Sequence, residues 1–507
     1  METNTIERTA PTMKEFYQKF GLKDYPFNIF TAENEAQFAE DIFVHPNGYD
    51  AIRASFDSNR SIIIRGNRGT GKTALLNDLY KSIQASNHIT CMIEDYSNLN
   101  MHPSNAEYYR LIIENLVSAL FNKLFSEKDR LKKANREDKV FLSFLLHEYT
   151  NQVTQAELTR KIEGIQLNGL KRFLRKRADL LRAILNYGIT AGLNVVNDVI
   201  RNYFDCLPPV QESQIKDIFP QISFSVETDF QSAEASYDML QRICTIIYKL
   251  GYNRITVFFD KFDEDSRMEN NAETISDFVV TLLTDNKLLE NPNIQLIISI
   301  WEVPLKRLLE TVRTQKHYCP LLSWPTSYLV EALNRRISTF SNTEISDYML
   351  LLDDNVSEQA IDEILYLSNG NPRDLWHIFD YIFQAQYTID SNCEKLSEAA
   401  VAQGLKDFVS NFNFYEYYPK KPRSKASTMD VYSYIKHLLK LPTEDFTKNQ
   451  LNSLAQTGSS TNNYVVGMEN IGLVAKTNEK QNGGVVYHIN DPKVVYAIKN
   501  GLDISRI

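Results

Sequence analysis

A glycine-rich octapeptide carries the clearest chemical signal in this sequence. Residues 66–73 read Gly-Asn-Arg-Gly-Thr-Gly-Lys-Thr and fit the pattern GxxxxGK[ST] in full. Glycines at these positions let backbone N–H groups close around phosphate oxygens, while Lys72 reaches the β- and γ-phosphates and the Thr73 hydroxyl binds Mg²⁺. The context that this chemistry requires is present, because a β-branched run (61–65) precedes the loop and a helical pattern follows it. The residues expected to hold ATP are Gly66, Asn67, Arg68, Gly69, Thr70, Gly71, Lys72, Thr73 and Ala74.

Carboxylates follow a second apolar run. The segment Ile-Thr-Val-Phe-Phe (255–259) is followed by Asp260, and Lys-Phe-Asp-Glu comes next. A phosphate-binding loop needs a carboxylate at the end of another buried strand to hold the water shell of Mg²⁺, and we assign that role to Asp260. Glu264 is the first candidate for polarising the attacking water, and Asp263 is the second. The alternative is that these acidic residues only begin the next helix as a cap.

Two polar side chains farther along the chain complete the expected site. Ser299 lies at the carboxyl end of the apolar run 294–300, where its hydroxyl can contact the γ-phosphate or the water. Arg373 follows Gly-Asn-Pro (370–372), which fixes the start of a helix and leaves the guanidinium free to project from the first turn. An arginine there can reach a phosphate from a separate helical unit, so hydrolysis can move that unit. The alternatives are an ordinary buried serine and a surface arginine.

In this order, the motifs resemble those of AAA+ ATPases of the origin-recognition type, within the wider class that includes the STAND-like ATPases of prokaryotic defence systems. Residues 66–73 match Walker A, 255–260 match Walker B, Ser299 stands at sensor 1, and 370–373 match sensor 2. The segment Asp-Tyr-Pro-Phe (24–27) and the helix after Trp324 also resemble bacterial members. The likeness covers about residues 60–100 and 230–410 and, more loosely, the C-terminal region.

The resemblance implies bound ATP and Mg²⁺, hydrolysis to ADP and phosphate, and self-association, since AAA+ sites are completed by an arginine from a neighbouring subunit. The helix expected at 304–316 carries Arg307 and Arg313, and Arg313 is our candidate for that arginine. Lys261 departs from the family, because AAA+ proteins have glutamate directly after the Walker B aspartate. The sequence Asp-Lys-Phe-Asp-Glu is instead similar to the hhhhDGhDE pattern of STAND ATPases, with lysine in place of the small residue. This departure permits slow hydrolysis and leaves both carboxylates open as the catalytic group.

Strand-like runs alternate with helical patterns and predict an α/β fold with a parallel sheet. The expected strands are 61–65, 90–93, 255–259 and 294–300, with a possible fifth at 321–322. Asp260 lies 187 residues after Thr73, whereas the core of the family that the motifs resemble needs well under half of that spacing. An insertion after the second strand is therefore expected. The expected domains are an N-terminal leader (1–60), a P-loop ATPase core (61–325) with a large helical insertion (101–228), a helical lid (326–415) and a C-terminal winged-helix domain (428–507).

Composition excludes several classes of protein. The 507 residues allow about three domains, and 43% hydrophobic with 23% charged residues exclude wholesale disorder. The five cysteines lie far apart and predict buried, reduced thiols of a cytoplasmic protein. The most apolar long stretch (180–200) contains charged and amide residues, so no membrane association is expected.

Net charge limits any contact with nucleic acid to a local patch, because the whole chain carries a charge of −9. The stretch Arg160–Arg182 holds eight basic and two acidic residues, with basic pairs repeating at i, i+4. Such a face can bind DNA phosphates. The slightly preferred alternative is a solvated helix face or a surface for an acidic partner.

The C-terminal region has the element order of a winged helix. Helices are expected at 428–440, 447–456 and 461–470, followed by a hairpin at 473–489. The third helix would enter a major groove, but its exposed candidates (459–464) include no arginine or lysine. Phosphate contacts would be left to Lys448, Lys476 and Lys480 or to the linker 420–425. DNA binding and protein docking both remain open.

These observations predict an ATP-binding and hydrolysing AAA+/STAND-like switch that regulates or assembles a partner. The resemblance suggests bacterial antiphage defence or mobile-element maintenance as the setting, with a separately encoded protein effector. The alternative is an origin-recognition-like, ATP-dependent DNA-binding protein. A third possibility is a loader for a separately encoded enzyme.

Overall fold

The computed structural model describes most of the chain outside the predicted insertion. The described residues are 11–35, 37–84, 87–152, 206–208, 232–420, 429–481 and 483–504. The predicted basic stretch Arg160–Arg182 and the apolar stretch 180–200 lie outside them.

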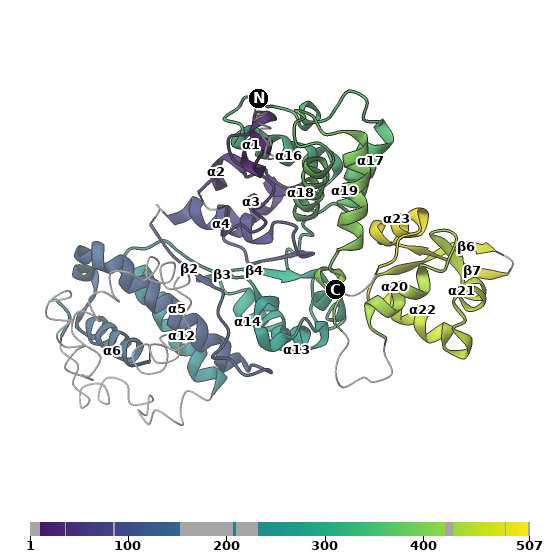
Figure 1. Ribbon diagram of the computed structural model, residues 1–507. Helices are drawn as coiled ribbons and strands as arrows, with labels where there is room; N and C mark the ends of the chain where they lie inside the picture. Colours follow the sequence, from purple (N-terminus) through teal and green to yellow (C-terminus); the bar gives the residue numbers. More distant parts are fainter. Residues whose placement is uncertain are drawn as a thin grey trace, which may run out of the picture.

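A four-stranded parallel sheet forms the centre of the molecule (Figure 1). Its strands are β1 (Ile62–Gly66), β2 (His88–Ile93), β3 (Arg254–Phe259) and β4 (Gln295–Trp301), in the order β1-β4-β3-β2. Every residue of β3 and β4 is buried, as expected for a parallel sheet covered on both faces. The four predicted strands are confirmed with small shifts at their ends.

The predicted fifth strand at 321–322 is wrong as a regular strand. The segment 318–322 runs parallel to β1 but pairs with it only at isolated bridges. Backbone N–H groups of Ile63 and Arg65 donate to the carbonyls of Tyr318 and Pro320, each at 3.0 Å. Pro320 has no N–H group to return, so the ladder is interrupted there.

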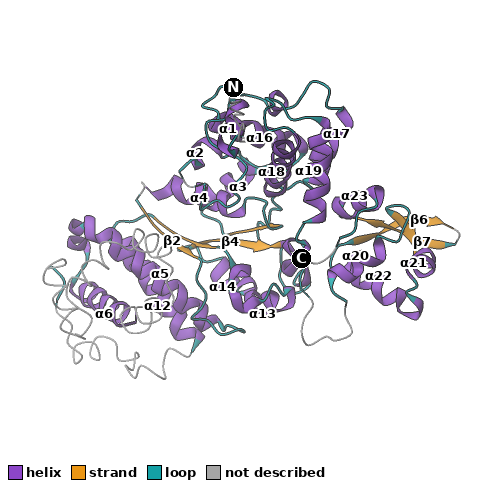
Figure 2. Ribbon diagram, viewed as in Figure 1, coloured by secondary structure: helices purple, strands orange, loops and turns teal. Residues whose placement is uncertain are grey.

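Helices cover both faces of the sheet (Figure 2). On one face, α3 (Tyr49–Asp57) and α4 (Lys72–Gln84) pack on the side chains of Ile62 and Ile64. On the other face, Ile63 belongs to a larger core. The helices of that core include α5 (Asn105–Ser126), α12 (Ala233–Lys249), α13 (Ala272–Thr284) and α14 (Asn286–Leu289). The alternation of β1 side chains between two cores explains its unbroken isoleucine run.

The predicted insertion begins with a helix that belongs to the sheet layer. Helix α5 packs on β2 and α12, so its apolar residues are part of the main core. The 3₁₀ helix η1 (Lys128–Lys133) and α6 (Arg136–Gln152) follow it.

The predicted leader is divided between two hydrophobic cores. Helix α1 (Met13–Lys19) and the Asp-Tyr-Pro-Phe segment pack with the helices of residues 326–416, which we call the lid after the prediction, and Phe27 stacks there on Phe379 with ring centroids 5.1 Å apart. Helix α2 (Ala39–Ile42) contacts α16 of the lid (Thr326–Phe340), and only α3 packs with the sheet.

The lid and the C-terminal region share one hydrophobic core. After α16, the lid consists of η6 (Tyr348–Leu351), α17 (Glu358–Leu367), α18 (Pro372–Ile389), α19 (Glu398–Ser410) and η7 (Phe414–Glu416). The C-terminal elements are α20 (Val431–Leu438), β5 (Asp445–Thr447), α21 (Lys448–Ala455), η8 (Gly458–Ser460), α22 (Thr461–Asn470), β6 (Val474–Gln481), β7 (Gly484–Ile489) and α23 (Pro492–Asn500). Strands β5, β7 and β6 form an antiparallel sheet in that order, and α23 packs on α17 and α19 of the lid.

The C-terminal region differs from expectation in two respects. Strand β5 and helix α23 were not predicted. Thr461, expected to be exposed, is buried, and its hydroxyl donates to the Gly458 carbonyl at 2.7 Å.

The expectation of buried cysteines holds for Cys91 and Cys244 but is wrong for Cys206, which is exposed. In the part of the chain that the structure describes, no helix is long and apolar enough to cross a membrane.

Candidate nucleotide-binding site

The glycine-rich loop connects the end of β1 to the start of α4. Gly69 and Gly71 both have φ of +82°, in the left-handed region that favours glycine. A Cβ atom at Gly69 would also lie only 2.5 Å from the Asn371 side chain. The loop therefore depends on glycine for its backbone conformation and for its close contact with the lid.

Lys72 is held inside the loop. Its ammonium donates to the carbonyls of Asn67 at 2.9 Å and Gly66 at 3.2 Å. Burial lowers the pKa of Lys72, while Asp263 and Asp260 oppose that change. The ammonium thus has neutral carbonyl partners that phosphate oxygens can replace.

The two residues expected to bind Mg²⁺ lie next to each other. The Thr73 hydroxyl donates to Asp260 Oδ2 at 2.7 Å. Burial raises the pKa of Asp260, and the hydroxyls of Ser299 and Thr73 with the charge of Lys72 partly oppose it. A hydroxyl and a carboxylate are oxygen ligands of the kind that Mg²⁺ prefers, so the residues present fit the ion.

Ser299 lies in β4, beside the carboxyl end of β3. Its side chain is buried near Asp260, and its hydroxyl makes no hydrogen bond to the residues that the structure describes. The structure thus brings Ser299 to the expected magnesium side of the site.

The residues after Asp260 form a tight turn and the short 3₁₀ helix η4 (Phe262–Glu264), which is followed by η5 (Ser266–Met268). Lys261 has φ of +64°, the left-handed conformation that glycine adopts without strain. Its ammonium contacts carboxylate oxygens of Glu33 at 2.6 Å and Glu94 at 3.1 Å. Burial disfavours the charged lysine, but these two carboxylates more than compensate and raise the pKa of Lys261.

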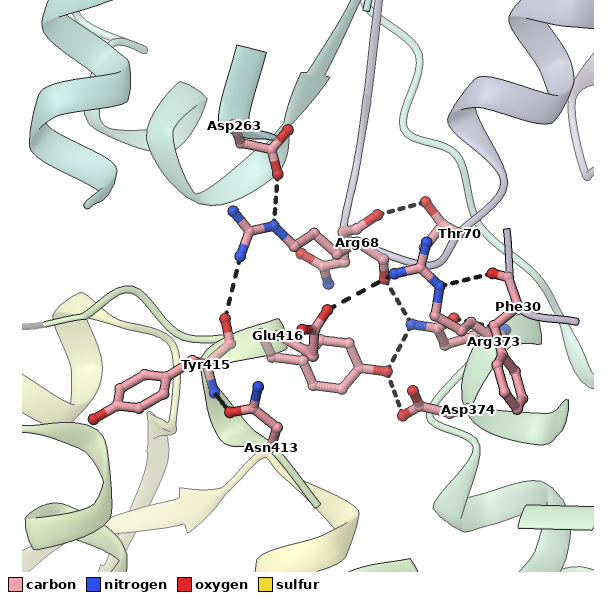
Figure 3. A network of polar contacts seen from close by, with 12 residues as sticks. Phe30, Arg68, Thr70, Asp263, Arg373, Asp374, Asn413, Tyr415 and Glu416 are labelled. Atoms are coloured by element: carbon pink, nitrogen blue, oxygen red, sulfur yellow. Dashed lines mark hydrogen bonds and ion pairs between the residues drawn. The ribbon is translucent and has the colours of Figure 1, made fainter. Parts of the chain in front are cut away.

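The two candidate catalytic carboxylates have different environments. Asp263 accepts a hydrogen bond from Arg68 Nε at 2.5 Å (Figure 3). Glu264 lines the cavity described below and is exposed, and its side chain has no hydrogen-bond or ion-pair partner among the described residues. Partial desolvation is the largest cause that raises the pKa of Glu264, and Lys261 opposes it. Glu264 is therefore the carboxylate that is accessible to a water molecule.

Arg373 is tethered, which corrects the expectation of a free side chain. Its Nε donates to the Phe30 carbonyl at 3.2 Å, and its guanidinium lies 3.7 Å from a carboxylate oxygen of Glu416 (Figure 3). The helix start that positions it is capped by Asn371, whose Oδ1 accepts from the Arg373 N–H. The Asn371 amide also donates to the Arg68 carbonyl at 2.7 Å, which joins the lid to the glycine-rich loop.

Most of the predicted site residues line one cavity of about 980 Å³, namely Arg68, Gly69, Gly71, Lys72, Thr73, Ala74, Asp260, Asp263, Glu264 and Arg373. Its lining does not include the predicted residues Gly66, Asn67, Thr70 and Ser299. The leader supplies one wall, including Phe43 and His45, and α16 supplies another through Tyr328. Cavities of this size accommodate cofactors.

Sequence reasoning missed the contacts that join this cavity to other parts of the chain. Trp324 donates from its indole N–H to the Thr70 carbonyl at 2.9 Å. Tyr417 accepts from Asn371 at 2.7 Å and donates to Asp374 at 2.6 Å. These partners lie far apart in the sequence, and only the family likeness singled out Trp324.

The predicted helix 304–316 is wrong. Helix α15 (Glu302–Arg307) ends early because the chain turns at Leu308, buries Val312 and reverses to run beside β1 from residue 318. Arg313 follows these turns, is exposed, and does not line the cavity.

A glycine-rich loop between a parallel strand and the following helix is the architecture of P-loop proteins. No family model and no curated protein matches this chain. Among solved structures, it is similar to the ORC2 protein of Aeropyrum pernix, with 11% identity, 95% of this chain and 97% of that chain covered, and a TM-score of 0.39.

Two other solved structures are similar at the same level. The Walker-type ATPase of Pyrococcus abyssi has 13% identity, with 94% of this chain and 100% of that chain covered and a TM-score of 0.40. Drosophila ORC bound to DNA has 10% identity, with 98% and 95% covered and a TM-score of 0.31. At these values, function has to be argued from the site itself.

Proposed function

We propose that this protein is an ATPase of the AAA+ type that binds and hydrolyses ATP and passes its nucleotide state to the lid and the C-terminal region. One observation carries the proposal: Lys72, Thr73 and Asp260 meet at a single large cavity that Arg373 of the lid also lines. Lysine, hydroxyl, carboxylate and arginine are the groups that phosphoryl transfer uses.

The residues of the chain divide the chemistry among them. Lys72 exchanges its two carbonyl partners for phosphate oxygens. Thr73 and Asp260 hold Mg²⁺, which neutralises charge on the phosphates when it is bound. Glu264 orients a water and accepts its proton as the water oxygen bonds to the γ-phosphorus and the bond to the β-phosphate bridging oxygen breaks.

Replacement of the loop lysine tests the proposal. Lys72→Ala removes two or more charge-assisted hydrogen bonds of about 1.5–3 kcal/mol each, so the affinity for a fluorescent ATP analogue falls by roughly 10²–10⁴-fold. Lys132→Ala is the control, since its side chain is 81% exposed and does not line the cavity. Equal affinity of folded Lys72→Ala and wild-type protein would refute the nucleotide site.

A buried chain of polar contacts supports the transfer of the nucleotide state. Asn371 contacts the glycine-rich loop and, through Tyr417, reaches Asp374. Asp374 in turn pairs at 2.9 Å with Lys493, in the first turn of α23. A change in the loop that shifts Asn371 is therefore directly linked to the docking of α23.

The output we propose is control of a protein partner. Leu454 in α21 and Val466 in α22 are large apolar side chains with exposures of 46% and 42%. Helix α22 has no arginine or lysine, and Lys448 is bonded to Asn462. Apolar exposure on α22, a helix without positive charge, favours a protein partner over DNA phosphates there, although Lys476 and Lys480 of β6 are exposed. The origin-recognition-like alternative is therefore not favoured, and the antiphage setting stays a prediction.

Binding to DNA separates these two outputs. A labelled duplex mixed with the full chain and ATP at low salt should show no ATP-dependent rise in anisotropy. A rise that falls steeply with salt concentration would favour the DNA-binding alternative.

A further inference from the structure

We infer that Arg68 is a positioning residue. It holds Asp263 as its counter-ion and thereby fixes the short turn of residues 261–264, which we call the acidic turn and from which Glu264 faces the nucleotide. The inference rests on the proposed ATPase function. It assigns a role to a position at which the pattern GxxxxGK[ST] accepts any residue.

The Arg68 guanidinium is held on several sides. Its Nε donates to Asp263 at 2.5 Å, and the two side chains are only 16% and 15% exposed. One terminal nitrogen donates to Asn270 Oδ1 at 2.6 Å and to the Tyr415 carbonyl at 3.2 Å. The guanidinium carbon lies 4.2 Å from the ring centroid of Trp301, at the end of β4. These contacts join the glycine-rich loop to the acidic turn, the lid and the end of β4, and Figure 3 shows those with Asp263 and Tyr415.

The acidic turn has an anchor at each residue before Glu264. Lys261 is held by two carboxylates. Phe262 is buried and stacks on Tyr96, with ring centroids 4.4 Å apart. Asp263 is held by Arg68. The Glu264 side chain has no polar partner among the described residues, so the other three side chains fix the backbone that directs it.

The competing assignment is that Arg68 is a phosphate ligand. Two of its three nitrogens, Nε and one terminal nitrogen, already donate to protein acceptors, so a phosphate contact through Nε would require the Asp263 bond to break, and the other terminal nitrogen is the one left without an acceptor among the described residues. That rupture would leave a mostly buried carboxylate without its cation beside Glu264. The geometry therefore favours an arginine that stays with Asp263 during turnover.

The two roles predict opposite kinetic signatures. A phosphate ligand contributes to ATP binding, so its loss raises KM and the dissociation constant. A positioning residue acts on the acidic turn, so its loss lowers kcat and leaves binding nearly unchanged. Arg68→Ala also leaves Asp263 unpaired, and a second change that neutralises Asp263 should relieve part of the damage.

The experiment is a double-mutant cycle in the full chain with Arg68→Ala, Asp263→Asn and the double variant. We measure kcat and KM for ATP, the affinity for a non-hydrolysable ATP analogue, and the melting temperature without nucleotide. The expected result is that Arg68→Ala lowers kcat by about tenfold or more with KM and affinity within about threefold of wild type, and that the double variant is faster and melts higher than Arg68→Ala. Asp263→Asn keeps an oxygen acceptor for Arg68 and loses less turnover than Arg68→Ala.

Matched variants make each outcome decisive. Arg53→Ala breaks an ion pair of 3.0 Å outside the cavity and should leave kcat unchanged. Arg68→Lys, which keeps the charge, should recover part of the turnover and covers the case in which Arg68→Ala does not fold. A tenfold loss of analogue affinity in Arg68→Ala, or a double variant no better than Arg68→Ala, would overturn the positioning role. Wild-type protein that binds ATP without turning it over would instead overturn the proposed hydrolysis, and the inference with it.

Discussion

Breaking the ion pair between Asp374 and Lys493 should weaken the packing of the C-terminal region on the lid. The pair joins α18 to the first turn of α23, with 2.9 Å between Lys493 Nζ and Asp374 Oδ2. The ammonium also lies 4.3 Å from the ring centroid of Phe412 and 4.4 Å from that of Tyr417. Lys493→Met keeps the apolar stem and removes only the charge.

The magnitude follows from burial. The Lys493 side chain is 0% exposed and the Asp374 side chain 6% exposed, so the variant leaves a carboxylate buried without a cation. Removing one partner of a buried pair costs about 3–5 kcal/mol, a large part of the roughly 5–15 kcal/mol that stabilises a protein. Lys499 lies on the same helix, and its pair with Glu444 is 63% and 33% exposed, so Lys499→Met should cost at most about 1 kcal/mol.

Calorimetry of the nucleotide-free full chain measures the difference. Lys493→Met should unfold at a lower temperature than wild-type or Lys499→Met protein, because the docking of α23 on the lid is weakened. The double variant with Asp374→Asn should recover part of the loss, since no buried charge remains unpaired. A Lys493→Met variant that melts like Lys499→Met would refute the reasoning that this pair fastens the C-terminal region.

Four further predictions concern the nucleotide site and its neighbours. Glu264→Gln should bind ATP normally and turn it over about 10²–10⁴-fold more slowly in a phosphate-release assay, whereas normal turnover with an inactive Asp263→Asn would exchange their roles. Burial raises the pKa of Asp260 in the folded protein above its value of about 4 in the unfolded chain. The contribution of this carboxyl to stability is therefore fully present below about pH 4 and is lost as the pH rises through the folded pKa. Asp260→Asn should therefore raise the melting temperature at pH 7 without nucleotide and Mg²⁺, and the gain should shrink toward pH 4. Arg373→Ala should change the stability without nucleotide by about 1 kcal/mol or less, but it should reduce the stabilisation by ATP by about 1.5–3 kcal/mol. If ATP stabilised the variant and the wild-type protein equally, the lid would not respond to nucleotide through this residue. Arg313→Ala should abolish a rise of specific activity with protein concentration, which in the wild type reports an arginine acting in trans and worth about 10³–10⁵ in rate; a concentration-independent, monomeric wild type would count against this role.

The sheet and the glycine-rich loop were predictable because local sequence determines them. The isoleucine run of β1 and the left-handed glycines at 69 and 71 leave few other conformations. The position of Asp260 beside Thr73 was predictable for the same reason, since Asp260 directly follows a strand buried along its whole length.

The long-range hydrogen bonds and ion pairs that hold the site residues in place could not be predicted from local sequence pattern. Arg373 is bonded to Phe30, which lies 343 residues earlier in the sequence. Arg68 and Asp263 are 195 residues apart, and no periodicity reports such a pair. The prediction of a helix at 304–316 was wrong because helix propensity is a local property, whereas the chain has to turn back toward β1 in this segment.

The partners of the cavity cations indicate which of them can move when ATP binds. Arg68 and Lys261 contact carboxylates at 2.5 and 2.6 Å, and removing either cation would leave an unpaired, largely buried charge. Lys72 is bonded to neutral carbonyls, and Arg373 has one carbonyl and a partly exposed carboxylate 3.7 Å away. Exchange of these weaker partners for phosphate oxygens costs least, since charge-assisted bonds are stronger than those to neutral acceptors. We therefore expect Arg68 and Lys261 to stay in place while Arg373 moves with the lid toward the γ-phosphate. The hydrogen bond between Asn371 and the glycine-rich loop should be the point about which the lid rotates.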